Sequence, residues 1–382
     1  MPNTPPVADA GLDQNAFVGS TVTLDGRLSS DANGDPRTYL WTLASRPPGS
    51  GAALSDPTGA QPVLVPDVAG TYVASLRVND GTDSSAPDSV TITATPNPWG
   101  TDVAMPTSRS DVAAVAIGST IYVLGGSVNG TPTGIVEIFD TTTHTWSSGP
   151  AMLNARSGFA VAASGTKIYA IGGGPIATNG PLSSVEELDT TTGIWAAKAP
   201  MPIPRTLASA AALGGTIYVV GGAVSPGGCI DWVCKGSDAV EAYQVASNTW
   251  TTLTSLPRRK IGPAAVALGN AIYALGGEQQ GGIVIGESSA SVYRYDVGAA
   301  AWTTVAPMPI ASSRPPAVEV DGKANVPLAS TLRYDPAADT WTPTEAPPLG
   351  SASRSNAATV GGKVYIFDAS GTFTYEPALD RP

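Results

Sequence analysis

The sequence is short of charge and has almost no histidine. Asp, Glu, Lys and Arg make up 13% of the 382 residues, and the balance is acidic, with a formal net charge of -11. A chain with so few cations cannot neutralise a row of phosphates, which argues against nucleic-acid binding. The single histidine excludes His-rich zinc, copper and di-iron sites and a multi-histidine proton relay.

Cysteine and long apolar runs are also scarce. The two cysteines, Cys229 and Cys234, cannot form a structural zinc site by themselves. No apolar run approaches the ~20 residues of a membrane helix, and no signal peptide follows Met1. Low charge with two close cysteines suits a secreted bacterial protein, so we expect an extracellular or cell-surface location, with the signal peptide absent from this sequence.

Turn-forming residues are abundant instead. The 43 glycines and 34 prolines make up about a fifth of the chain, against roughly 12% in average proteins. This composition argues against helical bundles and coiled coils. Short runs of alternating apolar and polar residues lie between the turns and are typical of half-buried strands. The sequence therefore predicts an all-β protein.

The N-terminal region predicts a β-sandwich over residues 1–95. Four alternating runs, at residues 21–24, 39–41, 71–78 and 89–93, are separated by Gly, Pro and Asp turns. Trp41 has the character of a core residue. The segments 6–11, 18–26, 29–36 and 70–81 resemble those of a PKD-type (Ig-like) domain. That resemblance implies a spacer or adhesive module, and Pro96, Asn97 and Pro98 form a short, stiff linker after it.

The rest of the chain, residues 99–382, is a repeat. Tryptophan recurs every 39–55 residues, and an Ile-Tyr-apolar-apolar-Gly-Gly motif ends at Gly126, Gly173, Gly222 and Gly277. An apolar-aromatic strand lies between each glycine pair and the next tryptophan. A repeat of this length with several short strands predicts a β-propeller. The tryptophans are Trp99, Trp146, Trp195, Trp250, Trp302 and Trp341.

The repeat resembles the Kelch repeat, which implies four-stranded blades around a central channel. Four repeats match closely, the fifth lacks the Tyr-x-x-Gly-Gly motif, and the sixth lacks the glycine pair. We therefore predict six blades. Trp99 has no preceding strands of its own, and the last repeat has no tryptophan after it. We expect the strand around Trp99 to close the ring as the outer strand of the final blade.

A cation recurs at one position of the repeat. Arg109, Arg156 and Arg205 each lie 13 residues before the motif tyrosine, and Lys260, with Arg259 beside it, takes the same place in the fourth repeat. Arg314 and Arg354 fall near the corresponding places in the fifth and sixth repeats. The Kelch resemblance places this position at the rim of the channel. Convergent cations there would bind a carboxylate or sulfate ligand. The alternative is that each cation hydrogen-bonds carbonyls of the neighbouring blade.

The long loops of blades one to four supply further candidates on the same face. Cys229 and Cys234 are expected to form a disulfide that closes a small ring around Trp232. Trp232 then either stacks on a sugar or partner, or folds back as part of a local staple. Glu278 opens the loop of the fourth blade. His144 precedes an outer strand, so we expect it at the periphery of the opposite face, away from chemistry.

A short acidic motif predicts calcium in the first domain. Asp31, Asn33 and Asp35 place oxygen ligands at alternate positions, like the start of a calcium loop. The later bidentate Glu is missing, although Asp80 or Asp83 could substitute for it. A polar Asx turn is the alternative interpretation, and no other cofactor is expected.

Three functions follow from these features. The favoured one is an extracellular binding or adhesion protein, in which the PKD-type domain presents a Kelch propeller to a glycan, including an anionic glycan, or to a surface protein. The second is an enzyme similar to the sialic-acid mutarotases, with Glu278 or Glu287 acting beside Arg156 or Arg205. The third is a structural subunit that self-assembles into a filament or layer.

Overall fold

The computed structural model describes residues 2–174, 180–224, 235–279, 287–328, 331–344, 356–368 and 371–379. The chain divides into two compact units, residues 1–98 and residues 99–381. All regular elements in the described ranges are β-strands. Within those ranges no helix is long and apolar enough to cross a membrane.

The first unit is a small β-sandwich. Its larger sheet has the order β1-β6-β5-β3, and β2 pairs with β4 in a second sheet. β1 runs parallel to β6, whereas the other neighbours are antiparallel. All four predicted strands are confirmed, and β1 and β4 are additional. The strands are β1 (Gln14–Phe17), β2 (Val22–Thr23), β3 (Thr38–Ser45), β4 (Val63–Leu64), β5 (Gly70–Asn79) and β6 (Asp88–Thr95).

The core of this unit follows from the period-2 pattern of its strands. Along β5, Tyr72, Ala74, Leu76 and Val78 are buried while the residues between them are more exposed. They pack with Trp41, which confirms it as a core residue. The buried Tyr72 hydroxyl accepts a hydrogen bond from the Val68 amide and donates one to the Val68 carbonyl, at 3.0 and 2.8 Å.

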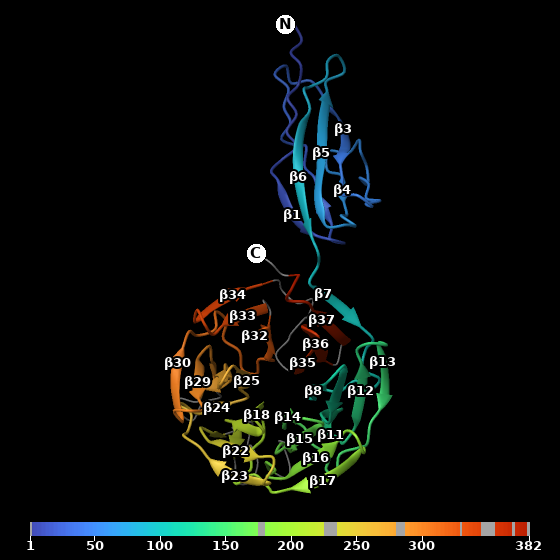
Figure 1. Ribbon diagram of the computed structural model, residues 1–382. Helices are drawn as coiled ribbons and strands as arrows, with labels where there is room; N and C mark the ends of the chain where they lie inside the picture. The colour runs from blue at the N-terminus through green and yellow to red at the C-terminus, as the bar shows by residue number, and fades with distance from the viewer. Residues whose placement is uncertain are drawn as a thin grey trace. The chain divides into compact units, whose positions relative to one another are not determined.

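The second unit contains six four-stranded antiparallel sheets within its described residues. Figure 1 shows them around a central axis, with β8, β14, β18, β25 and β35 nearest the centre. Inner strands of successive sheets contact one another, and β35 also contacts β8, so the ring is complete. The six-bladed propeller predicted from the repeat is therefore confirmed.

The strands of the first three blades are β8 (Ala113–Ile117), β9 (Thr120–Leu124), β12 (Val136–Asp140) and β13 (Thr145–Ser148); β14 (Ala160–Ser164), β15 (Lys167–Ile171), β16 (Val185–Asp189) and β17 (Ile194–Lys198); and β18 (Ser209–Leu213), β19 (Thr216–Val220), β22 (Val240–Gln244) and β23 (Thr249–Thr252). Those of the last three are β25 (Ala264–Leu268), β26 (Ala271–Leu275), β29 (Val292–Asp296) and β30 (Ala301–Val305); β31 (Val318–Val320), β32 (Lys323–Pro327), β33 (Thr331–Asp335) and β34 (Thr340–Pro343); and β35 (Asn356–Val360), β36 (Lys363–Asp368), β37 (Gly371–Tyr375) and β7 (Trp99–Asp102).

Short strands stand beside the blades where the inner strands begin. A bridge from Ser110 to Ser127 joins the segment before β8 to the first of these hairpins, and Thr206 and Ala223 form the equivalent bridge in the third blade. These hairpins therefore lie on the face at which the inner strands start. They are β10 (Ser127–Val128) with β11 (Thr131–Pro132), β20 (Ala223–Val224) with β21 (Lys235–Gly236), and β24 (Lys260–Ile261) with β27 (Glu278–Gln279) and β28 (Glu287–Ser288).

The repeated tryptophans tie each blade to the one before it. The indole N–H of Trp195 donates to the carbonyl of Pro150, and that of Trp250 donates to the carbonyl of Ala199, both at 2.8 Å. Each acceptor lies four residues after the tryptophan of the preceding blade. Trp302 and Trp341 make the same bond at 2.9 Å. In each of these four blades, the repeat therefore places one indole N–H against a carbonyl of the preceding blade.

The N-terminal strand closes the ring as predicted. β7 pairs antiparallel with β37, with Trp99 opposite Tyr375 and Asp102 opposite Thr372. Trp146 of the first blade donates to the carbonyl of Val103 at 2.9 Å. Val103 stands four residues after Trp99, so this contact repeats the one made by the other tryptophans. The closing strand β7 is therefore joined to β37 by main-chain pairing and to the first blade by the same tryptophan hydrogen bond that links the other blades.

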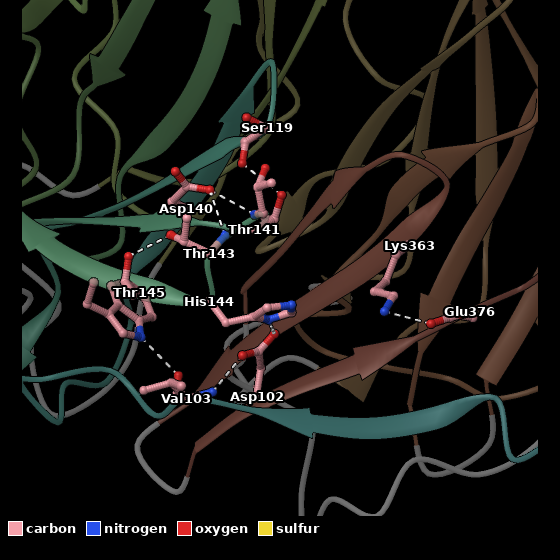
Figure 2. Close-up of polar contacts among 12 residues, drawn as sticks. Asp102, Val103, Ser119, Asp140, Thr141, Thr143, His144, Thr145, Lys363 and Glu376 are labelled. Atoms are coloured by element: carbon pink, nitrogen blue, oxygen red, sulfur yellow. Dashed lines mark hydrogen bonds and ion pairs between the residues drawn. The ribbon is translucent and has the colours of Figure 1, made fainter.

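The single histidine belongs to this closure. His144, in the turn between β12 and β13, lies with its Nδ1 2.8 Å from Asp102 Oδ2, as Figure 2 shows. The residues at the same repeat position, Asn248 and Asp339, accept the amide of Ala199 and Ala306 in the preceding blade. His144 is thus part of the contact between adjacent blades at the seam, where the chain's first propeller strand meets the first blade.

The glycine pairs allow close approach of neighbouring segments. Gly173 has a φ of +83°, and a Cβ added to it would lie 2.5 Å from Phe159 Cβ and 2.8 Å from the carbonyl oxygen of Ser157. Both the backbone conformation and the lack of space exclude a larger residue there. This explains why the repeat keeps a glycine at this position.

Replacing Gly173 by alanine is expected to destabilise the propeller by about 2–5 kcal/mol, the combined cost of a left-handed alanine and an overpacked contact. Chemical denaturation measures the effect. Gly165→Ala is the matched control, since Gly165 has a similar φ of +61° with nothing within 4 Å of the added Cβ. Equal losses in the two variants would contradict the role assigned to close packing.

Candidate functional site

The recurring cations are the first candidates, and the structure buries all four. Arg109, Arg156, Arg205 and Lys260 lie just before or within the short strands that precede the inner strands, with at most 1% of their surface exposed. Their charged groups point into the blade rather than into the channel. Arg354 lies outside the described residues.

The three arginines bind groups of their own blades. Arg109 donates to the carbonyl of Gly125 and to Glu137 Oε2, both at 2.7 Å. Arg156 donates in the same way to the carbonyl of Gly172 and to Glu186. Each carboxylate is the second residue of the third strand of its blade. The repeat therefore contains a buried arginine–glutamate pair.

The third pair is the most deeply buried. Arg205 Nη2 lies 2.7 Å from Glu241 Oε2, and neither side chain is exposed. Burial lowers the pKa of Arg205 and raises that of Glu241, and in both cases it outweighs the attraction between the two charges. Such a pair contributes little net stability, although breaking it leaves an uncompensated buried charge.

The fourth blade replaces this pair by Lys260 and Tyr293. Lys260 Nζ donates to the carbonyl of Gly276 and to Ser291 Oγ, both at 2.6 Å, and it lies 5.3 Å from the centre of the Tyr293 ring. Burial without a carboxylate lowers the pKa of Lys260 to about 8.

The stability of the propeller is therefore expected to depend on pH through Lys260. Between pH 8 and the ordinary lysine pKa of 10.5, the unfolded chain binds more protons than the folded one. The free energy of unfolding should rise over this window by up to ~1.4 kcal/mol per pH unit. Denaturation at pH 8, 9 and 10 measures it. Lys260→Arg, which does not titrate there, should remove the rise, and an unchanged slope in that variant would refute the assignment.

These contacts correct the interpretation of the cation row. The side chains are enclosed within their own blades, so they do not converge on a ligand at the channel rim. The geometry favours a structural role, but one different from the expected bonds to the neighbouring blade. It is the main chain that bridges the blades: the carbonyl of Arg156 accepts the amide of Gly126, and that of Arg205 accepts the amide of Gly173, at 3.0 and 2.9 Å.

The enzyme hypothesis is affected by the same burial. Arg156 and Arg205 are paired with glutamates of their own blades. Glu278 instead lies half-buried on β27, whose main chain pairs with that of β24. Glu287 is exposed on β28. Within the described ranges, no contact joins either glutamate to either arginine. The acid–base pair predicted for a sugar mutarotase is therefore not assembled by the side chains described.

The remaining loop candidates fall into two groups. Arg259 is exposed on the hairpin face next to Lys260. Trp232, Cys229 and Cys234 lie outside the described residues, so the predicted disulfide and the stacking tryptophan stay predictions.

The calcium motif forms a turn in the structure. Asp31 Oδ1 accepts the amides of Asn33 and Asp35 at 2.8 and 3.0 Å, and Asn33 Oδ1 accepts the amide of Thr4 at 2.8 Å. This is the geometry of the alternative Asx turn. Across the described ranges, no group of three or more His, Cys, Asp or Glu side chains is placed to hold a metal ion.

The channel itself provides the strongest candidate site. A cavity of about 190 Å³ is lined by the first residues of the inner strands and the segments just before them. It lies at the end of the channel from which the hairpins arise. Its lining includes Phe159, Pro263, Pro315 and Pro316 together with small residues.

One ion pair lies in this lining. Arg314 Nη1 is 3.3 Å from Asp111 Oδ1, and both side chains are about a quarter exposed. Asp111 precedes the inner strand of the first blade and Arg314 precedes that of the fifth, so the pair spans part of the channel mouth. Within the described part of the chain, these are the two charged residues of the cavity lining.

Sequence reasoning missed the glutamates, and it placed Arg314 near the cation position of the fifth blade without its partner Asp111. Glu137, Glu186 and Glu241 each occupy the second position of an otherwise largely apolar strand, in the same blades that carry the arginines, and this coincidence was visible in the repeat. Asp111 and Arg314 are 203 residues apart. Only an alignment of the fifth repeat with the first would have shown that Asp111 and Arg314 occupy the same repeat position.

Comparison with known families agrees with this architecture. Residues 10–94 match a family of PKD domains, residues 88–222 match the KLHDC2/KLHL20/DRC7 Kelch-repeats domain, and residues 204–257 and 259–309 match the Kelch motif. None of the curated proteins compared with the chain matches it. The class is that of propeller proteins with an Ig-like domain. More particularly, the chain carries a PKD domain followed by a six-bladed Kelch propeller, an architecture of binding and protein-interaction proteins.

Proposed function

We propose that this chain is an extracellular binding or adhesion protein that takes a glycan or a surface protein at the hairpin-bearing face of its propeller. The observation that carries the proposal is the cavity of about 190 Å³ at the channel mouth, on the face where the hairpins stand. Rigid strands position this face, and binding residues concentrate on loops held by such scaffolds. The PKD domain is assigned the role of a spacer.

The burial of the cation row changes the ligand that we propose. An anionic glycan was expected from several converging cations, and these are enclosed in their blades. At the channel mouth the cation among the described lining residues, Arg314, is paired with Asp111. We therefore favour an uncharged ligand group over an anionic one at this face.

The test is binding of the whole chain to an array of neutral and acidic glycans and purified surface proteins. Arg314→Gln alters the channel mouth. Lys323→Ala is the matched control, because Lys323 also forms an ion pair in the fifth blade, with Asp335 at 2.7 Å, and is similarly exposed. Lys323 opens β32, at the other end of the blade.

We expect at least one ligand that binds wild type and Lys323→Ala equally and Arg314→Gln more weakly. Ligand binding that all three proteins share would move the site away from this face. Absence of any ligand, together with concentration-dependent large species in light scattering, would favour the self-assembling subunit instead.

A further inference from the structure

The residues around the channel mouth occupy one position of the repeat. Asp111, Gly158, Leu207 and Gly262 each stand two residues after the buried cation of their blade, and all four have a positive φ of 52–61°. Arg314 takes the corresponding place in the fifth blade, two residues after Ser312. The carbonyl of Ser312 accepts the amide of Gly277, just as the carbonyls of the buried cations accept amides of the earlier glycine pairs. Two of these five described positions, Asp111 and Arg314, therefore carry a charged side chain.

The neighbouring glycine makes room for Arg314. A Cβ on Gly262 would lie 2.8 Å from Arg314 Cγ. The side chain of Arg314 thus passes over a residue that has no side chain. The close packing over Gly262 and the ion pair with Asp111 together position the guanidinium of Arg314 at the channel mouth.

The ion pair leaves hydrogen-bonding capacity for a ligand. Its single contact of 3.3 Å is longer than the roughly 2.7–2.9 Å of an optimised charge-assisted bond. A guanidinium has five N–H donors and a carboxylate has two acceptor oxygens. Since both side chains are about a quarter exposed, a ligand group can reach each of them. The site offers donors and acceptors side by side.

The other lining residues have mostly apolar side chains, but the surface that they expose to the cavity is mainly polar. Phe159, Pro263, Pro315 and Pro316 contribute carbon surfaces, and alanines and glycines fill most of the remainder. Two further polar side chains are Ser209, whose hydroxyl accepts the amide of Ala265 at 3.0 Å, and Asn356, whose amide nitrogen donates to the carbonyl of Val112. Among the described lining residues, a ligand meets a mainly polar surface, limited areas of carbon and one compensated pair of charges.

We propose that the channel mouth binds a neutral sugar ring through two vicinal hydroxyls, a proposal that rests on the binding function above. One hydroxyl donates to Asp111, and its neighbour accepts from Arg314. The further hydroxyls of the ring meet the mainly polar surface of the lining, and its C–H face packs on the limited carbon surface there. The pair has no net charge, so it gives an ionic ligand little net attraction and suits a neutral group that places a donor beside an acceptor. The cavity of about 190 Å³ has room for one such ring.

A primary carboxamide, as on a glutamine side chain, is the competing group because it also places a donor beside an acceptor. It carries a single donor–acceptor group, whereas a sugar ring has further hydroxyls for the mainly polar surface of the cavity. The same experiment therefore includes N-acetylglutamine amide as a probe.

The test is titration calorimetry of the whole chain with methyl glycosides of mannose, galactose and glucose, their 2-deoxy and 3-deoxy analogues, methyl glucuronide and N-acetylglutamine amide. The variants are Arg314→Gln and Asp111→Asn, with Lys323→Ala as control. Asparagine tolerates the positive φ of 52° at Asp111, so this variant is expected to fold. Near-ultraviolet circular dichroism checks the fold of each protein.

At least one methyl hexoside is expected to bind, and both mouth variants should weaken its binding about tenfold or more, the scale of a lost hydrogen bond to a charged group. Removing one hydroxyl of the recognised pair should have the same effect. Lys323→Ala should bind as wild type does.

Three results would overturn the sugar assignment. They are preference for the glucuronide, preference for the carboxamide, and hexoside binding that neither mouth variant changes. If no hexoside binds while a protein ligand from the array depends on Arg314, the binding function stands and the sugar assignment fails. If neither probe nor array ligand binds, the proposed function itself fails.

Discussion

Replacing Glu241 by leucine is expected to lower the free energy of unfolding by about 3–5 kcal/mol, the usual cost of breaking a buried ion pair. Arg205 would remain fully buried with its charge uncompensated, because Glu241 is the carboxylate that its guanidinium binds. Burial already lowers the pKa of Arg205, so the lone charge would be costly. Chemical denaturation of the whole chain measures the loss.

The matched variant is the double replacement Arg205→Met with Glu241→Leu. It should recover most of the stability, since an apolar pair of similar volume avoids the burial cost of both charges. The fifth blade supports this expectation, because it carries Ser312 and Leu332 at the two positions and is still a four-stranded sheet. A double variant as unstable as the single one would contradict the view that the pair adds little net stability.

Replacing Trp99 by alanine should open the seam of the propeller. Trp99 is buried in a cluster with Val364 and Ile366, and its ring lies 4.7 Å from that of Tyr375. Truncation of a buried tryptophan costs about 3–5 kcal/mol. The loss should be concentrated in β7 and β37, where faster hydrogen exchange would appear first.

The control for this prediction is Val103→Ala, four residues later. Val103 is half exposed, and it accepts the bond from Trp146 through its main chain, so the replacement should change stability by no more than about 0.5 kcal/mol. Uniform loss of protection over all six blades in Trp99→Ala, with no local weakness at β7 and β37, would show that the seam is not the place where the ring opens.

The fold could be read from the sequence because its elements repeat. The tryptophans, glycine pairs and alternating strands recur in register, and each occurrence supports the others. The closing strand followed from Trp99 standing alone. β1 was missed because Gln14–Phe17 shows no alternation, and β4 because two residues carry no period. Both depend on partners that are distant in sequence.

The site was less predictable for a physical reason. The sequence placed the cations correctly within the repeat, but their direction depends on the glutamates two strands away, which bury Arg109, Arg156 and Arg205 inside the blades. Asp111 and Arg314 meet across the channel only when the ring closes. Propensity and spacing describe one blade at a time, so a contact between the first and fifth blades does not appear in them.

The central claim is that ligands bind at the channel mouth and that the buried cations have only a structural role within their own blades. The most direct measurement compares the affinity of one array ligand for wild type, Arg314→Gln and the double variant Arg205→Met with Glu241→Leu. We predict that binding falls in Arg314→Gln and is unchanged in the double variant. Loss of binding in a folded double variant, with full binding by Arg314→Gln, would contradict the account and return the ligand site to the cation row.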